Sequence, residues 1–180
     1  MVYTPGNRKQ VERKEHEMAS TASFDIVSRF DRQELRNALD QAGREIRTRY
    51  DLKDTNTVID ESDDGITITT QSEYSLGAVK DIIESKLIGR KLSLKILDYQ
   101  NEEEASGARY RQVVKLKEGL TDDIAKQISK HIRDTFKKAK PQIQADTIRV
   151  QAKSRDELQE VIQELKSGDW PVALQFVNYR

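Results

Sequence analysis

The sequence predicts an α+β protein in which one β-α-β-β-α-β unit occurs twice. The first observation is an internal repeat: moving the 180-residue sequence along itself by 82 positions places Ile66 on Ile148, and apolar positions of 66–94 on those of 148–176, without a gap. The second observation is the periodicity of the matching positions. They alternate at every second residue, then follow helical spacing, then alternate again, which is typical of strand, helix and strand.

The elements of the first half follow from local patterns. The strand-like run 24–30 comes before apolar residues at helical spacing (Leu35, Leu39, Ala42 and Ile46). Residues 56–60 indicate a short strand that enters a turn at Asp63-Asp64-Gly65. Ser72 is a favourable N-cap for the second helix. Leu92 and Leu94 are expected to lie in the last strand.

The second half repeats this order. A strand is expected over 110–117, followed by a helical stripe of apolar residues (Ile124, Ile128, Ile132 and Phe136). A short strand over 141–145 enters a turn near Asp146 that lacks glycine. Ser154 occupies the position of Ser72 in the repeat, so it is expected to begin the equivalent helix.

This order of elements is the ferredoxin-like split βαβ pattern. Its antiparallel sheet carries helices on one face and can leave the other face open, which suits RNA or nucleotides without implying them. We expect a first domain over 18–100, a linker over 101–108 and a second domain over 109–180. Residues 1–17 are charged and almost without apolar side chains, so we expect a flexible extension before a natural start at Met18.

Long segments spread along the chain follow one recognisable pattern. They are 23–28 (SFDIVS), 34–38 (ELRNA), 49–53 (RYDLK), 142–144 (QIQ), 148–150 (IRV), 155–159 (RDELQ) and 174–180 (LQFVNYR). Through these segments the sequence from Met18 to Arg180 resembles the YajQ family of small bacterial proteins. It departs from the pattern at Ala145 and Ala152, where many relatives have glycine, and at Pro141, where valine is common.

The resemblance implies two ferredoxin-like domains that exchange their first strands, so that 23–30 joins the second sheet and 109–118 joins the first. It also implies a nucleotide- or RNA-binding role. GTP, ATP, cyclic di-GMP and tRNA are associated with family members, and some members are linked to transcriptional or virulence regulation. Neither catalytic activity nor a cofactor comes with the resemblance.

The charge distribution bears on these partners. The chain has 31 Lys+Arg and 31 Asp+Glu, and a net charge of zero by itself argues against nucleic acid. However, residues 109–153 contain twelve cationic and five anionic side chains, a net of +7. Residues 1–17 carry +1 and the remainder carries −8. The chain is therefore polarised, and its basic segment is available for an anionic partner.

Within the basic segment, a helix over 122–140 would carry five cations on one face. They are Lys126, Lys130, Arg133, Lys137 and Lys140. At about 100° per residue they form one stripe, nearly opposite the apolar stripe. Like charges at this spacing repel each other, and an anionic partner would relieve the repulsion. The alternative is an ordinary solvated face.

A second candidate surface lies on the adjoining strands. Arg149, Gln151 and Lys153 alternate with apolar residues, and Gln142 and Gln144 occupy a similar pattern in the preceding strand. Amides and guanidinium groups suit base edges and phosphates, although an ordinary polar face has the same pattern. No aromatic residue lies in 142–153, so base stacking would need Tyr110, Phe176 or Tyr179. Phe176 is expected in the core, because it takes the place of Leu94 in the repeat.

Nothing in the sequence indicates an enzyme. His131 lies on the packed side of its helix and His16 lies in the extension. The chain lacks a P-loop, a Gly-x-Ser-x-Gly motif and cysteine, and the acidic runs 60–64 and 102–104 are best explained as solvated turn and linker segments. No apolar run approaches the ~18 residues of a membrane span, and the absence of cysteine fits the cytoplasm.

We therefore expect a non-catalytic nucleotide- or RNA-binding protein without a bound metal, and one class of function remains as the alternative. That alternative is a protein-interaction adaptor that docks through its oppositely charged segments. In such an adaptor, the residues outside 1–17 and 109–153, which together carry a charge of −8, would be as necessary as the segment 109–153, which carries +7.

Overall fold

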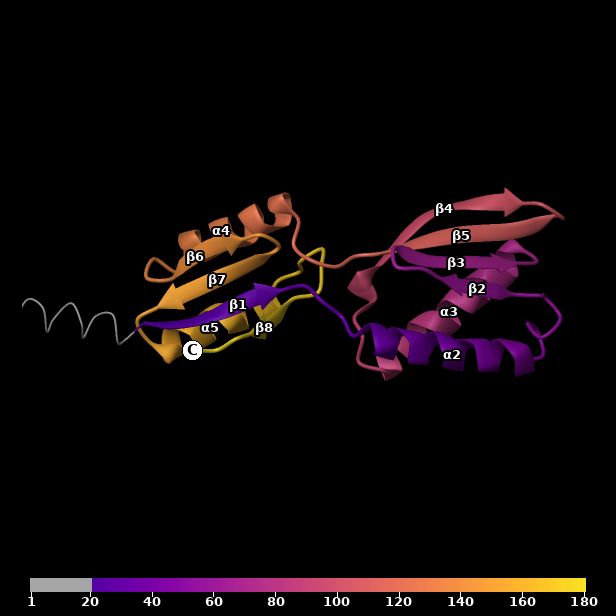
Figure 1. The fold of residues 1–180 in the computed structure, drawn as a ribbon, viewed down its shortest axis with the longest axis horizontal. Coiled ribbons are helices and arrows are strands. Elements are labelled where there is room, and N and C mark those ends of the chain that lie inside the picture. Colours follow the sequence, from indigo (N-terminus) through magenta and orange to yellow (C-terminus); the bar gives the residue numbers. More distant parts are fainter. Residues whose placement is uncertain (1–20) are drawn as a thin grey trace, which may run out of the picture. The chain divides into compact units, whose positions relative to one another are not determined.

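The computed structural model describes residues 21–180, which form two compact units (Figure 1). Among the described residues, the C-terminal unit contains 21–28 together with 119–180, and the central unit contains 29–118. The extension predicted over 1–17, the start predicted at Met18 and His16 lie outside the described residues.

Four helices and eight strands make up the described residues. In chain order they are β1 (Ala22–Val27), α2 (Arg32–Thr48), β2 (Val58–Glu61), β3 (Gly65–Thr70), α3 (Glu73–Gly89), the short 3-10 turn η1 (Leu94–Ile96), β4 (Leu97–Ala105), β5 (Arg109–Leu116), α4 (Asp122–Thr135), β6 (Lys140–Gln144), β7 (Thr147–Ala152), α5 (Arg155–Ser167) and β8 (Gln175–Val177). The predicted α+β class is confirmed. Among the helices of residues 21–180, none is long and apolar enough to cross a membrane.

The central unit has a four-stranded antiparallel sheet in the order β2-β3-β5-β4. Helices α2 and α3 supply the apolar side chains that pack against one face of this sheet, among them Leu35 and Leu76. Strand β3 contributes Ile66 and Ile68, each 1% exposed. Strand β5 pairs with both β3 and β4, so it lies inside the sheet rather than at its edge.

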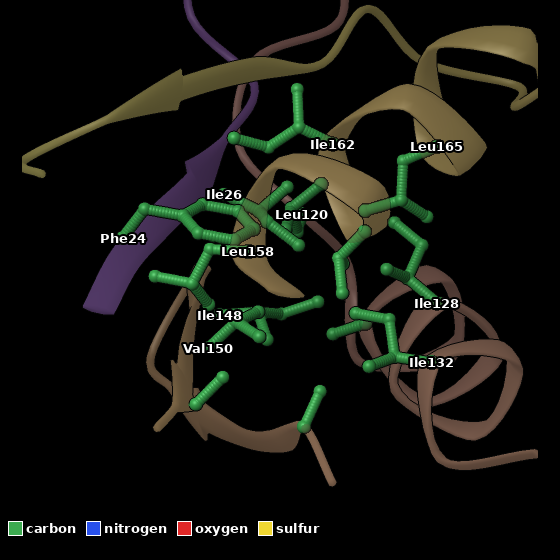
Figure 2. Close-up of a cluster of buried hydrophobic side chains, with 14 of the residues drawn as sticks. Phe24, Ile26, Leu120, Ile128, Ile132, Ile148, Val150, Leu158, Ile162 and Leu165 are labelled. Atoms are coloured by element: carbon green, nitrogen blue, oxygen red, sulfur yellow. The ribbon is translucent and has the colours of Figure 1, made fainter. Parts of the chain in front are cut away.

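The C-terminal unit has a second antiparallel sheet in the order β6-β7-β1-β8. Strand β1 lies between β7 and β8 (Figure 1). Phe24 is opposite Val150, and Ile26 is opposite Ile148. Their side chains form one core with the apolar faces of α4 and α5, which include Ile128 (Figure 2). A strand from residues 22–27 thus completes a sheet whose other strands come from residues 140–177.

The two sheets share one strand order. In the central unit β5 occupies the position that β1 occupies in the C-terminal unit, between the strand that precedes the second helix and the strand that follows it. The strand pairing therefore matches the exchange of first strands that the family resemblance implies, and the fold is consistent with two βαββαβ-like units.

The serines predicted to begin equivalent helices do so. The Ser72 hydroxyl oxygen accepts a hydrogen bond from the backbone N–H of Ser75 at 3.1 Å. The Ser154 oxygen accepts one from the N–H of Glu157 at 3.2 Å. Each bond satisfies a backbone donor that the first turn of a helix leaves unpaired.

The basic helix is shorter than the predicted span 122–140. Helix α4 ends at Thr135, Phe136 has an extended backbone, and Ala139 is buried with 5% exposure. The chain thus turns into the core four residues after the helix ends. Lys140 is the first residue of β6 and precedes Pro141, a position that disfavours helix. Lys137 and Lys140 therefore do not belong to the helical stripe of cations that was predicted.

The segment predicted as a linker over 101–108 is mostly strand. Residues 101–105 belong to β4, which pairs with β5 in a hairpin. Two of its carboxylates have partners: Glu103 pairs with Arg111 at 2.9 Å, and Glu102 pairs with Lys80 at 3.1 Å. The polar composition that suggested a linker reflects an edge strand, because charged side chains are common on the edges of sheets.

Candidate functional site

One face of the C-terminal sheet lacks a covering helix from its own unit, because α4 and α5 both pack on the opposite face. The core side chains of β1 and β7 point toward these helices, so the alternate residues point the other way. The strand register aligns Gln142, Arg149, Asp25 and Val177 in one row across the four strands. We call this side of the C-terminal sheet the open face.

A second row of the open face contains Lys140, Gln151, Ser23 and Arg180. Ser23 and Arg180 exchange backbone hydrogen bonds of 3.0 and 2.9 Å, although regular pairing from Val177 would place residue 179 opposite Ser23. Asn178 causes the shift by adopting a positive φ of 56°. This one-residue bulge brings the Arg180 side chain to the open face, since directly paired residues share a side of a sheet.

A buried carboxylate lies at the centre of the first row. Asp25 is 7% exposed, and its carboxylate oxygens accept hydrogen bonds from Arg149 Nε at 2.9 Å, Arg149 Nη2 at 3.4 Å and Asn178 Nδ2 at 2.9 Å. The bond from Arg149 is the main cause that lowers the pKa of Asp25 below its usual value, with help from Asn178 and against the effect of burial. Arg149 is therefore held in place by a carboxylate.

The remaining cations of the open face have no such partner. Lys140, Lys153 and Arg180 are exposed, and within residues 21–180 none of them forms an ion pair. Lys153 directly follows β7 and continues its alternation. These three cations and Arg149 carry four positive charges, and Asp25 carries one negative charge. The side chains of the open face therefore have a net charge of +3.

The corresponding face of the central sheet is electrically balanced. Within its paired strands it carries three cations on β5 and three carboxylates on the edge strands β2 and β4: Arg109, Arg111, Lys115, Asp60, Asp98 and Glu103. Two sheets of the same strand order therefore differ in charge, and the surplus of cations belongs to the C-terminal sheet.

The ten residues predicted as a site divide into two groups. Six lie on or beside the open face: Lys140, Gln142, Gln144, Arg149, Gln151 and Lys153. Three lie on α4 (Lys126, Lys130 and Arg133), and Lys137 lies in the turn that follows. Because the buried residues of α4 pack against the inner side of the sheet, the helical cations and the open face lie on opposite sides of the unit.

The cations of α4 have local explanations. Lys130 pairs with Asp134 at 3.3 Å on the same helix. Arg133 lies in the last turn, where the negative end of the helix dipole favours a cation. The helix also contains Asp122 and Asp123, so its side-chain charge is zero.

Three residues of the open face were absent from the predicted site: Asp25, Asn178 and Arg180. The alternation of Phe24 and Ile26 with polar neighbours indicates that Asp25 faces away from the core. No local signal indicates that its partner is Arg149, which is 124 residues away.

The aromatic residues are divided between core and surface. Phe176 packs edge-to-face against Phe24 at 5.9 Å between ring centroids, so its predicted core position is confirmed. Tyr110 packs against the core of the central unit. Tyr179 is 59% exposed, but its ring lies 6.3 Å from that of the core residue Phe24, and it lines a pocket of about 270 Å³ with Leu158 and Gln159 of α5, so it lies on the helix-covered side of the sheet. None of the three rings considered for base stacking therefore lies on the open face.

His131 has a structural environment. Its Nε2 lies 2.9 Å from Glu164 Oε1, and its ring packs edge-to-face on Trp170 at 5.6 Å. Across the part of the chain that the structure describes, no cluster of three or more histidine, cysteine, aspartate or glutamate side chains is placed to hold a metal ion.

Comparison with known proteins gives one consistent result. The family model described as "Nucleotide-binding protein YajQ-like" matches residues 22–180. A "Nucleotide-binding protein" of Synechococcus sp. (strain JA-3-3Ab) is 60% identical over 163 residues, which cover 91% of this chain and all of that protein. Proteins of Trichodesmium erythraeum (strain IMS101), with the same description, and Nostoc sp. (strain PCC 7120 / SAG 25.82 / UTEX 2576), described as "Nucleotide-binding protein all4662", are each 58% identical with the same coverage.

Proposed function

The chain belongs to the YajQ-like family of nucleotide-binding proteins, and on this premise we propose that it is a non-catalytic protein whose open face binds RNA or a cyclic dinucleotide. The observation that carries the proposal is the charge of this face. Its one side-chain carboxylate, Asp25, is already engaged by Arg149, while Lys140, Lys153 and Arg180 have no side-chain ion pair within residues 21–180.

The placement of the cations favours a ligand with more than one phosphate. Lys140 and Arg180 lie at opposite ends of one row, on segments three strand spacings apart, which is roughly 14 Å at the usual distance between strands. An oligonucleotide or a cyclic dinucleotide can place phosphates at both ends of the row. Each cation that neutralises a phosphate adds to the binding and to its dependence on salt.

The groups between the cations suit nucleobases. Gln142 and Gln151 are exposed on the open face and carry both donors and acceptors for base edges. Arg149, oriented by Asp25, presents a fixed guanidinium between them. This combination supports a sensor or carrier of nucleotides in the cytoplasm, with cyclic di-GMP and tRNA as the first ligands to test.

The repeat supports a related proposal about origin. The aligned apolar positions of 66–94 and 148–176, together with the shared strand order of the two sheets, support two ferredoxin-like units that arose by duplication and exchanged their first strands. In the C-terminal unit the exchanged strand brings Asp25 and Ser23 to the open face.

The test compares two variants that each remove three cations. In K140A/K153A/R180A the cations come from the open face, and in K126A/K130A/R133A they come from α4. Binding of a fluorescein-labelled single-stranded RNA and of cyclic di-GMP is measured by fluorescence anisotropy and calorimetry over a series of salt concentrations.

We expect the open-face variant to lose at least about tenfold in affinity. For RNA, the slope of the logarithm of the binding constant against the logarithm of the salt concentration should become shallower by about 2, because each lost phosphate contact to a single strand contributes about 0.7. The α4 variant should keep the affinity and the salt dependence of the wild-type protein. Loss of binding in the α4 variant alone would refute the assignment to the open face. Failure of the wild-type protein to bind either ligand would refute the function itself.

A further inference from the structure

The two sheets of residues 21–180 have four edge strands, and three of them carry a feature that hinders pairing with a further strand. Strand β6 contains Pro141, which lacks an N–H on the side that faces away from β7. Strand β4 has a bulge between Tyr99 and Glu102. Strand β8 has three residues and ends at Asn178, which has a positive φ of 56°.

The fourth edge strand, β2, has neither a proline nor a bulge. Its four residues pair with β3 in one continuous register. At the end of this hairpin, the backbone N–H of Ser62 donates to the carbonyl oxygen of Gly65 at 2.8 Å. Because antiparallel partners alternate between bonded and non-bonded pairs, the N–H and C=O groups of Ile59 and Glu61 point away from β3. No strand of the described residues pairs with them on that side.

The side chains beside this free edge are cationic where they face α2. Arg44 and Arg47 are exposed and lie with β2 along one groove, and neither forms an ion pair within the described residues. The carboxylate of Glu61 is already paired with Arg36 at 3.4 Å. Asp40 is the other carboxylate of this groove, so the side chains without an ion pair carry a net charge of +1.

The opposite side of the free edge has a different character. Val58 and Asp60 alternate with the two residues that face α2, so they lie on the other side of the sheet. Val58 is 43% exposed and is the large apolar side chain of this strand on that side. A strand added to β2 would therefore meet cations on one side and an aliphatic side chain on the other.

We propose that β2 is a docking edge at which an extended segment of a partner protein adds a strand to the central sheet, with acidic side chains toward α2 and apolar side chains toward Val58. In this mode of recognition, main-chain hydrogen bonds supply affinity and alternate side chains supply specificity. Arg44 and Arg47 can bind carboxylates through paired hydrogen bonds. The edge belongs to the central unit, so the proposal does not rest on the open face.

The probe is the peptide TVEVEVT with blocked ends, which in an extended chain has its glutamates on one side and its valines on the other. Binding to the full-length protein is measured by NMR titration and by amide hydrogen exchange. We expect the bound peptide to slow the exchange of the Ile59 and Glu61 amides. The control peptide TVKVKVT should bind at least about tenfold more weakly, and R44E/R47E should reverse this preference.

Two substitutions of one residue separate the main chain from the charge. Glu61→Pro and Glu61→Ala both remove the carboxylate that pairs with Arg36, but only proline removes the N–H at the free edge. Asp60, the preceding residue, already has the extended backbone that a following proline requires. We expect Glu61→Ala to bind TVEVEVT at least as tightly as wild type, and Glu61→Pro to lose at least about fivefold. Circular dichroism checks that each variant is folded.

Three results would overturn the proposal: no binding of TVEVEVT by the wild-type protein, equal affinity for the two peptides, or equal affinity of the two Glu61 variants. Binding that leaves the exchange of the Ile59 and Glu61 amides unchanged would place the peptide elsewhere and would also contradict it. Sedimentation of the free protein tests a second copy as the occupant. A dimer in which these two amides are already protected would show that β2 pairs with β2 of another copy, and the proposed partner would be wrong.

Discussion

Replacing Ile26 by alanine should destabilise the C-terminal unit and leave the central unit protected, although Ile26 precedes the central unit in the chain. Ile26 is 0% exposed in strand β1, where it lies opposite Ile148 and packs with the apolar faces of α4 and α5 (Figure 2). An Ile→Ala substitution at such a site costs about 2–5 kcal/mol. At about 1.4 kcal/mol per factor of ten, this is roughly a 30-fold to several-thousand-fold increase in the population of the opened unit.

Native-state hydrogen exchange measures this population for each unit separately. In Ile26→Ala, the amides of β7 and α5 should exchange faster by that factor, while those of α2 and α3 should keep their wild-type rates. The matched control is Ile68→Ala, which removes the same atoms from a residue of 1% exposure in the central unit. It should show the reverse pattern. Faster exchange of α2 and α3 in Ile26→Ala, with β7 and α5 unchanged, would refute the strand assignment.

Three further substitutions and one control, Gly77→Ala, test the backbone and the buried ion pair. Gly65→Ala should lower stability by about 1–3 kcal/mol in urea unfolding, because its Cβ would lie 2.5 Å from a backbone oxygen of β5. Gly77→Ala, where nothing lies within 4 Å, should not lower it. Ala145→Gly should raise the urea midpoint, with a gain of about 0.5–1 kcal/mol, because Ala145 has a positive φ of 53°. The pKa of Asp25 is lowered in the folded protein by Arg149, so its stabilising effect is present above the ordinary pKa of 3.8 and is lost as the pH falls through the folded value. Thermal unfolding of Asp25→Asn should therefore show a smaller loss of stability below about pH 4 than wild type, and an equal loss in both would contradict this role.

Local patterns were sufficient to predict several elements. The hydroxyl groups of Ser72 and Ser154 satisfy backbone donors of the next helical turn, so the information needed to start these helices lies within four residues. Alternation correctly indicated that Arg149 and Gln151 point away from the core, because side chains of a strand change sides at every residue.

The extent of the basic helix needed more than a local pattern. The spacing of Lys137 and Lys140 fits a helical stripe, yet burial of Ala139 in the core and the proline at 141 favour a turn and a strand. The acidic edge strand was missed for a similar reason. Its glutamates have a linker-like composition, but backbone pairing with β5 makes them part of a sheet, and Lys80 and Arg111 on other elements pair with Glu102 and Glu103.

The amino-acid sequence alone determines which residues are apolar, at what period they recur and that the pattern occurs twice. These properties define the α+β class, the order of most elements and the inner and outer side of strands such as β1 and β7. The neighbour of each strand is decided only when the whole chain folds, because strand pairing joins residues that are far apart in sequence. Asp25 meets Arg149 across 124 residues, and the bulge at Asn178 brings Arg180 beside them. The strands that form the open face are far apart in the sequence, and no local pattern predicts that they pair.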